Sequence, residues 1–253
     1  MITREHIGEK MKIQRTELYD NGTLLRSPVN LEGNEAAKAI LSYELGKAFE
    51  SRIARLKNKD FTIIANNCCG TLMYESLHLK KLSPTCSLTI GGDAFVKFCR
   101  HLKEYLRMPV EEATEEDRKK YPGCKVPIGI LRGNGALPPV GLVFTHYDRF
   151  ENAREAWYRR RERVNYDNLF FILDCETETD EKLPDEFERL PYENKVIFTK
   201  LEDGERWNDT FSFSCFTDGK YHPGYAFDYL FTDSGIFNVL DEFDYVSWLN
   251  QGL

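Results

Sequence analysis

The stretch Phe61-Thr-Ile-Ile-Ala-Asn-Asn-Cys-Cys-Gly70 decides the fold class. It begins with a short apolar, β-branched run, a composition typical of a strand buried on both faces. The run breaks into two asparagines, two cysteines and a glycine, and Thr71 to Leu79 then has a helix-like pattern. Strand, short polar turn and helix make the βα unit in which α/β proteins place reactive groups, at the carboxyl end of the sheet. We therefore expect an α/β protein with a functional site at this turn.

The alternation of strand and helix continues to about residue 199, which indicates a mainly parallel sheet flanked by helices. The other predicted strands cover residues 86–90, 126–131, 140–145, 169–173 and 195–199. The predicted helices cover residues 34–57, 71–79, 93–108, 150–164 and 183–190. Alternating charges over residues 111–125 are typical of a solvated loop or a short surface helix.

Beyond residue 200 the sequence becomes rich in aromatic residues, and it ends with Phe243-Asp-Tyr-Val-Ser-Trp-Leu-Asn250. This composition predicts an α+β C-terminal part with a few strands and a final helix docked on the core. The sequence therefore predicts three segments: an N-terminal helical segment (1–60), the α/β core (61–200) and an aromatic-rich C-terminal closure (201–253). A division into two α/β subdomains is the alternative.

Composition and charge limit the function classes. With 42% hydrophobic and 30% charged residues, the 253-residue chain is typical of a soluble globular protein. A net charge of −7 argues against a nucleic-acid partner. No apolar run approaches the roughly 20 residues of a membrane span. The first residues lack the hydrophobic core of a signal peptide, so we expect a cytoplasmic protein.

Seven cysteines occur without the spacing of a disulfide framework or a zinc site. In a cytoplasmic protein they are expected to be reduced, and most to be small buried apolar groups. Cys68 is the exception, because it lies in the predicted turn beside a helix N-terminus. We expect that position to lower the pKa of its thiol.

A first candidate site combines Cys68, His146 and Asp174, each at the predicted carboxyl end of a strand. If these strands are parallel neighbours, the three side chains gather at one edge of the sheet. A thiol, an imidazole and a carboxylate then form a nucleophile, its base and an orienting group, as acyl transfer or hydrolysis through a thioester requires. The alternative is that Cys68 is a packing thiol and His146 an ordinary polar group.

Residues of the same turn are expected to complete this site. Asn66 and Asn67 bind sugar hydroxyls or satisfy turn amides. Gly70 lets the backbone approach a ligand, and the backbone N–H groups of Cys69 and Gly70 stabilise an oxyanion.

A second candidate site is an arginine-rich helix end followed by a polar turn. Arginines at such a position suit bidentate binding of a phosphate or carboxylate. The alternative is a solvated helix face. The candidate substrate-binding residues are Arg159, Arg160, Arg163, Asn165 and Asp167.

A third candidate is the pair Asp174 and Glu176, which follows the most apolar predicted strand. Two carboxylates there are able to hold a divalent cation against a nucleotide sugar, as in metal-dependent glycosyltransferases. A polar strand end explains the pair equally well. The leading hypothesis needs no cofactor, and this alternative needs a divalent metal.

Several motifs together resemble a known bacterial family. They are Phe61-Thr-Ile-Ile-Ala-Asn-Asn-Cys68, Leu82-Ser-Pro-Thr85, Phe95-Val-Lys-Phe98 with 102–106, His146-Tyr147, Trp157 with 159–163, Asn165-Tyr-Asp-Asn-Leu-Phe-Phe171, Leu190-Pro-Tyr-Glu-Asn-Lys-Val196 and Trp248-Leu-Asn250. In this order they are similar to domain of unknown function number nineteen-nineteen, whose members are often labelled exopolysaccharide biosynthesis proteins. The family tends to show Arg-Asp-Gly after the strand at 169–173, where this chain has Asp174-Cys-Glu-Thr-Glu-Thr-Asp180.

The resemblance implies a two-part α/β fold and a role in the synthesis of surface polysaccharide. Our leading hypothesis is a transferase acting on a carbohydrate or an anionic sugar-derived small molecule, by acyl transfer or hydrolysis at Cys68. The first alternative is the metal-dependent glycosyltransferase that uses Asp174 and Glu176. The second is a non-catalytic carbohydrate-binding or scaffold protein.

Overall fold

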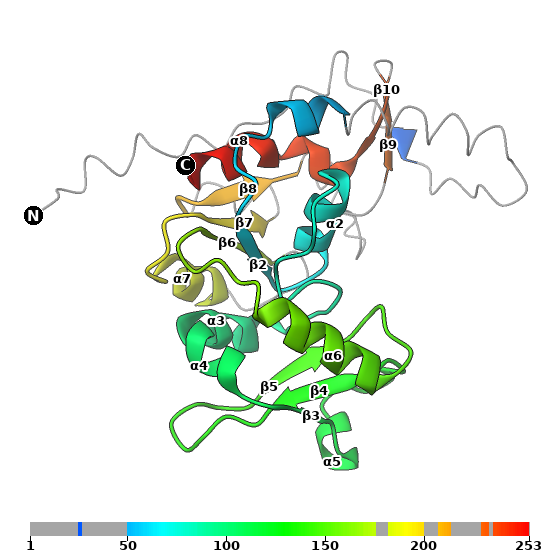
Figure 1. Cartoon of the computed structure of the whole chain (residues 1–253), viewed down its shortest axis with the longest axis vertical. Coiled ribbons are helices and arrows are strands. Elements are labelled where there is room, and N and C mark those ends of the chain that lie inside the picture. Colours follow the sequence, from blue (N-terminus) through cyan, green and yellow to red (C-terminus); the bar gives the residue numbers. More distant parts are fainter. Residues whose placement is uncertain are drawn as a thin grey trace, which may run out of the picture.

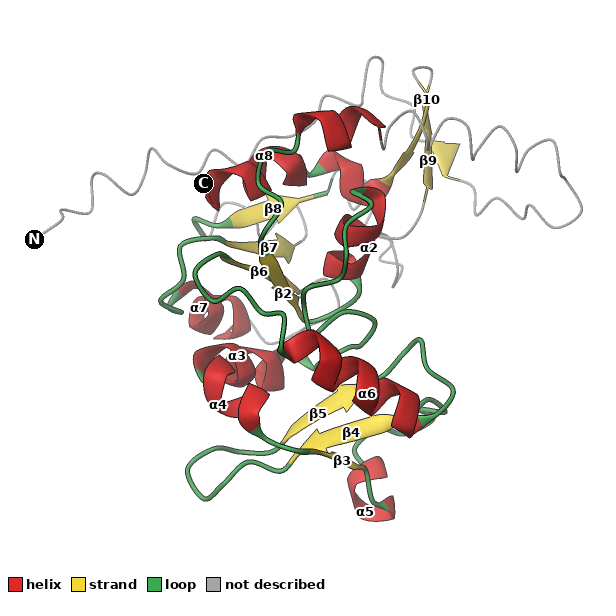
Figure 2. Ribbon diagram, viewed as in Figure 1, coloured by secondary structure: helices red, strands yellow, loops and turns green. Residues whose placement is uncertain are grey.

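The computed structural model describes residues 25–26, 50–175, 182–199, 207–213, 229–232 and 235–252 (Figures 1 and 2). Its centre is a parallel sheet of four described strands in the order β2-β6-β7-β8. These strands are β2 (Thr62–Ala65), β6 (Leu169–Asp174), β7 (Lys195–Thr199) and β8 (Thr210–Ser212). All neighbours run parallel, as the alternation of strands and helices predicts.

Helices cover both faces of this sheet. Across the whole described structure, the labelled helices are α2 (Cys69–Ser76), α3 (Gly92–Arg100), α4 (Leu102–Arg107), α5 (Glu115–Arg118), α6 (Phe150–Arg161), α7 (Lys182–Glu188) and α8 (Tyr245–Leu249), of which α5 lies away from this sheet (Figure 1). Two short 3₁₀ helices, η5 (Val239–Glu242) and η6 (Asn250–Gly252), flank α8. Of the predicted helix at 34–57, the structure describes the last residues, and 50–55 are helical. No described helix has the length and apolar character of a membrane span.

Alternate residues of each central strand pack on opposite faces of the sheet. Ile63 and Phe170 belong to one core with α2 and the C-terminal residues. Ile64 and Phe171 belong to a second core with α3, α4, α6 and α7. Because side chains alternate with period two along a strand, a strand buried on both faces needs a continuous apolar run. The runs at 62–65 and 169–173 meet that requirement.

The C-terminal part closes one face of the sheet with aromatic rings, as predicted. Trp248 of α8 packs edge-on against Phe170 of β6, with ring centroids 4.8 Å apart. Phe198 of β7 packs against Phe213 and Phe243 at 5.0 and 5.4 Å. These edge-to-face contacts join residues far apart in the sequence into one cluster.

A second, antiparallel sheet contains β3 (Val110–Glu112), β4 (Ile128–Leu131) and β5 (Val140–Val143). Figure 1 shows it at one end of the molecule, with α6 across it. The strands predicted at 126–131 and 140–145 are present but lie outside the parallel sheet, so His146 does not end a parallel neighbour of β2. The two strands pair antiparallel with each other, and the connection between them contains an isolated bridge between Asn134 and Leu137 and a glycine, Gly133, whose φ is +74°. A Cβ on Gly133 would lie 2.0 Å from the carbonyl oxygen of Leu137, so only glycine fits.

A third sheet pairs β1 (Leu25–Arg26) and β10 (Gly235–Asn238) with β9 (Tyr229–Thr232). Both pairs are antiparallel.

The predicted strand at 86–90 is also wrong. Residues 84–87 form turns, Ser87 has a positive φ of 64°, and Thr89 alone makes a β-bridge, to Val143 of β5. The segment instead covers the free edge of β2, where Thr85 Oγ1 accepts the N–H of Ala65 at 3.1 Å. Covering an edge strand in this way prevents pairing with another chain.

Candidate active site

The turn that follows β2 carries Cys68 at the N-cap position of α2. Gly70, in the first turn of this helix, faces the strand: a Cβ there would lie 3.0 Å from Ile63 Cγ2. The missing side chain of Gly70 therefore lets α2 pack closely on β2, a packing role that differs from the expected approach to a ligand.

Hydrogen bonds attach this turn to the end of the neighbouring strand β6. Asn66 Nδ2 donates to the Asp174 carbonyl oxygen at 3.0 Å, and the Asp174 N–H donates to Asn66 Oδ1 at 2.8 Å. Asn67 Nδ2 donates to Asp174 Oδ2 at 2.5 Å. The Cys69 N–H donates to Asn67 Oδ1 at 3.0 Å. Asn66, Asn67 and Asp174 thus meet at the carboxyl edge of the parallel sheet and hold the turn in one conformation.

The structure brings the thiol of Cys68 next to the imidazole of His146. Cys68 Sγ lies 3.3 Å from His146 Nε2, within hydrogen-bonding distance for sulfur. The thiol is buried, with 8% of the residue exposed, whereas His146 lies at the surface. A nucleophile and a base within hydrogen-bond reach, with one partner open to solvent, are the geometry that thiol-dependent catalysis needs.

His146 reaches Cys68 from the antiparallel sheet. It follows β5, and β5 is held by Thr89, whose N–H donates to the Val143 carbonyl at 2.8 Å. The next residue, Ile90, donates its N–H to the carbonyl of Asn66 at 2.8 Å. The 89–90 segment therefore connects the end of β5 to the turn after β2. The expected meeting of the two side chains occurs, but the strands that carry them belong to different sheets.

The environment raises the pKa of the Cys68 thiol above its ordinary value of about 9. Burial is the largest cause, the hydrogen bond with Thr145 acts in the opposite direction, and Glu75 raises and Lys81 lowers the pKa to smaller extents. The expectation of a lowered pKa was wrong, because desolvation of the buried thiolate is the largest effect on this group.

Asp174 does not orient the imidazole. Its carboxylate accepts the hydrogen bond from Asn67, and within the described residues the His146 ring hydrogen-bonds to Cys68 alone. Asp174 is adjacent to the turn because β6 pairs with β2. The arrangement is a cysteine–histidine pair with a carboxylate that fixes the turn, which differs from the predicted triad.

The backbone N–H groups at the start of α2 are divided between two roles. The Cys69 N–H is used by Asn67, so it does not have the expected role of an oxyanion donor. In the described part of the chain, the N–H groups of Gly70 and Thr71 have no acceptor. Such N–H groups at a helix N-terminus are available to an anion.

The arginine-rich segment does not join Cys68. Arg160 is buried and donates to the Cys86 carbonyl at 2.6 Å, and Arg163 reaches the Lys81 carbonyl at 3.5 Å. Both side chains therefore hold the 81–86 segment, while Arg159 is exposed. The Asn165 N–H donates to Thr62 Oγ1 at 2.9 Å, and the Asp167 N–H donates to Asn165 Oδ1 at 3.1 Å. This turn lies at the amino ends of β2 and β6, opposite to Cys68.

The predicted metal pair is only half described, since Glu176 lies outside the described residues. Among the residues that are described, no three His, Cys, Asp or Glu side chains are grouped as metal ligands.

Thr145 is a site residue that the sequence argument missed. Its Oγ1 lies 3.6 Å from Cys68 Sγ, so the sulfur has two polar neighbours from the same loop. The available signal was its position, next to His146 at a predicted strand end.

Replacing Thr145 by valine is expected to slow alkylation of Cys68 by iodoacetamide. Valine keeps the shape but removes the hydroxyl that stabilises the thiolate, which is worth roughly twofold to tenfold in rate. The rate constant for Cys68 is measured by peptide mass spectrometry. Thr145→Ser is the control and should react like the wild type. An unchanged rate in Thr145→Val would show that the hydroxyl does not act on the sulfur.

The fold and the site together define an α/β protein with a cysteine–histidine pair at the carboxyl edge of its parallel sheet. The chain belongs to the family described as domain of unknown function DUF1919, whose model matches residues 41–250. This confirms the resemblance seen in the sequence motifs. The chain is also similar to an uncharacterized protein of Haemophilus influenzae, with 29% identity over 214 residues, covering 78% of this chain and 87% of that protein.

Proposed function

We propose that the protein catalyses acyl transfer or hydrolysis through a thioester on Cys68. The observation that carries the proposal is the distance of 3.3 Å between Cys68 Sγ and His146 Nε2, on a turn fixed by Asn66, Asn67 and Asp174. A packing thiol does not need an imidazole at hydrogen-bonding distance. An activated nucleophile does.

In the proposed reaction, His146 Nε2 takes the thiol proton as Cys68 Sγ attacks the acyl carbonyl carbon. The tetrahedral oxyanion that forms is stabilised by the N–H groups of Gly70 and Thr71. The leaving group departs with the proton from Nε2, and a thioester remains on Cys68. Water or an acceptor hydroxyl then attacks the thioester and gives its proton to His146 Nε2. The S–C bond breaks, and His146 passes this proton to the leaving sulfur, which restores the thiol.

The substrate class that we propose is a sugar-derived precursor of surface polysaccharide, handled in the cytoplasm. The support is the family resemblance, together with the acidic charge of the chain, which disfavours nucleic acid. The short distance between Cys68 Sγ and His146 Nε2 supports the type of reaction, whereas the substrate class rests on the resemblance and the charge.

The experiment that tests the reaction type is acylation by p-nitrophenyl acetate, a general acyl donor. We expect intact-protein mass spectrometry to show the addition of one acetyl group, and peptide mapping to place it on Cys68. Treatment with hydroxylamine should remove it, as for a thioester. Cys68→Ala should not be labelled. If the acetyl group appears on surface lysines alone, the proposal is wrong and the non-catalytic carbohydrate-binding or scaffold alternative is favoured.

The pH dependence of Cys68 reactivity follows from the direction of its pKa shift. A raised pKa means that the thiol stays protonated to higher pH, so the thiolate fraction near neutral pH is smaller than for a free cysteine. The rate of iodoacetamide alkylation of Cys68 should therefore continue to rise beyond a pH of about 9. A plateau reached near neutral pH would instead indicate a preformed thiolate–imidazolium pair.

A further inference from the structure

Thr71, in the first turn of α2, makes a hydrogen bond that leaves its own helix. The side chain is buried, and its Oγ1 accepts the backbone N–H of Ser87 at 2.8 Å. A threonine hydroxyl inside a helix commonly bonds instead to a carbonyl of the preceding turn. The Thr71 hydroxyl therefore joins the start of α2 to a segment 16 residues further along the chain.

The peptide unit between Cys86 and Ser87 is held at both of its polar ends. Its N–H donates to Thr71 Oγ1, and its carbonyl oxygen accepts a hydrogen bond from Arg160 Nη1 at 2.6 Å. Arg160 is 9% exposed and belongs to α6, so side chains from two helices fix one peptide. A guanidinium on the carbonyl polarises the peptide and strengthens its N–H as a donor.

The backbone of Ser87 shows that these contacts determine the local conformation. Its φ of 64° lies in the left-handed region, which is unfavourable for a residue with a Cβ. Such a conformation persists only where the surrounding contacts over-determine it. The Cys86–Ser87 peptide is therefore a rigid support for the first turn of α2.

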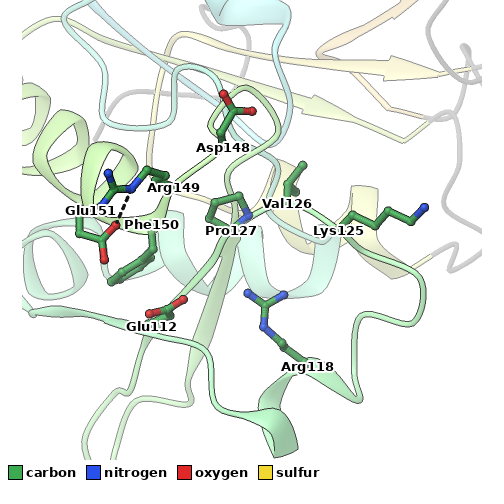
Figure 3. Close-up of a pocket in the computed structure, with 9 residues that line it drawn as sticks. All are labelled: Glu112, Arg118, Lys125, Val126, Pro127, Asp148, Arg149, Phe150 and Glu151. Atoms are coloured by element: carbon green, nitrogen blue, oxygen red, sulfur yellow. Dashed lines mark ion pairs between the residues drawn. The ribbon is translucent and has the colours of Figure 1, made fainter.

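The sulfur of Cys68 is positioned by other contacts. The turn that carries it is held by the hydrogen bonds of Asn66 and Asn67 to the end of β6. The open pocket in Figure 3 is also separate, because the residues that line it do not include those around the Cys86–Ser87 peptide. The support therefore acts on the backbone of Thr71, one of the two N–H groups that the proposed reaction assigns to the oxyanion.

We propose that the Thr71 hydroxyl is a positioning group for the oxyanion of the thioester reaction, and this inference rests on that proposed function. Anchored to the Cys86–Ser87 peptide, the hydroxyl fixes the Thr71 N–H, for which the described residues provide no acceptor. An N–H held in a fixed place stabilises developing negative charge without a cost of reorganisation. The role concerns the oxyanion, and the nucleophile–base pair is separate from it.

Two reagents that react with the same sulfur separate this role from a merely structural one. Acetylation by p-nitrophenyl acetate passes through a tetrahedral oxyanion. Alkylation by iodoacetamide forms the S–C bond as iodide leaves, and no negative charge develops on a carbonyl oxygen. A group that positions the oxyanion donors therefore changes the first rate and not the second, whereas disruption of the turn changes both.

We expect Thr71→Val to lower the rate constant for acetylation of Cys68 by at least about tenfold, less than the loss of a whole oxyanion donor. Valine keeps the shape but leaves the Ser87 N–H buried without an acceptor, so the peptide and the first turn of α2 move apart. The rate constant for alkylation should stay within about twofold of the wild type. Both are measured by peptide mass spectrometry on the full chain, with circular dichroism as the check of folding.

Thr71→Ser keeps the hydroxyl and should restore both rate constants. Thr71→Ala removes the hydroxyl without a second branched group to place, and it should give the valine result even where the valine variant folds poorly. The matched control is Ser76→Ala in the last turn of α2, which removes a half-buried hydroxyl bonded to Tyr245 Oη at 2.7 Å. It should leave both rate constants unchanged.

An equal fall of both rate constants in Thr71→Val, or an acetylation rate constant equal to that of the wild type, would overturn the role of Thr71. Either result would leave the reaction standing, because wild-type Cys68 would still be acetylated. If wild-type Cys68 is not acetylated, the proposed reaction fails and the role of Thr71 fails with it.

Discussion

Replacing Cys68 by serine is expected to reduce kcat/KM for p-nitrophenyl acetate by roughly 10³-fold or more. The hydroxyl of serine is a far weaker nucleophile, and it gives up its proton to His146 far less readily than a thiol does. The folded structure should survive, because the side chain changes by one atom and its polar neighbours, Thr145 and His146, remain. Rates are measured by release of p-nitrophenol, and folding by circular dichroism.

The matched control for this variant is Cys124→Ser, which removes a thiol from the loop before β4. It should retain the wild-type rate. A Cys68→Ser protein that keeps more than about a tenth of the wild-type kcat/KM would show that the reaction does not pass through this thiol.

Replacing Trp248 by alanine is expected to lower the free energy of unfolding by about 3–5 kcal/mol. The indole is 2% exposed and packs against Phe170 of β6 and Phe243, with centroids 4.8 and 5.4 Å away. Its removal opens a cavity between α8 and the parallel sheet that the neighbouring rings cannot fill. The change is measured from the midpoint and slope of urea denaturation.

Trp248→Phe provides the comparison. In the described part of the structure, the buried Nε1 of Trp248 has no hydrogen-bond acceptor, so its loss removes an unsatisfied donor. This partly offsets the lost volume, and phenylalanine should cost less than half as much as alanine. A Trp248→Ala protein within about 1 kcal/mol of the wild type would mean that α8 contributes little to holding the sheet together.

The central strands were predictable because their burial on both faces imposes a sequence signal. The runs at 62–65, 169–174 and 195–199 are mainly apolar, as strands covered on both faces require. The predicted strand bounds agree with the observed ones to within about a residue. The segment at 86–90 has a similar composition but no strand, because Thr85 and Ile90 bond to β2 as a covering loop. Short apolar runs do not distinguish these two cases.

The meeting of Cys68 and His146 was predicted from an assumption that only partly holds. Both residues follow strand ends, yet β5 belongs to an antiparallel sheet, and the bonds of Thr89 and Ile90 bring it to the turn. The parallel pairing of β2 and β6 correctly predicts the position of Asp174 beside the turn. It does not predict that the Asp174 carboxylate bonds to Asn67 and not to His146. A sequence pattern shows which residues end strands. It does not show which hydrogen bonds they then make.

The thiol pKa and the arginine cluster depend on burial, which local sequence does not reveal. A helix N-terminus beside Cys68 is visible in the sequence, whereas the desolvation that raises the pKa of its thiol depends on packing from distant segments. Arg160 appeared to lie on a solvated or ligand-binding helix face, but it is buried against the carbonyl of Cys86. Its guanidinium holds the 81–86 segment in place through the hydrogen bond to Cys86.

The most direct test of the nucleophile–base pair is the rate of Cys68 acetylation in the His146→Gln variant near neutral pH. Glutamine keeps a polar side chain of similar size but accepts no proton. If His146 is the base for Cys68, the rate constant for acetyl transfer from p-nitrophenyl acetate to this variant should fall by roughly 10²-fold or more. A rate in His146→Gln equal to that of the wild type would contradict the account, since Cys68 would then react without a base.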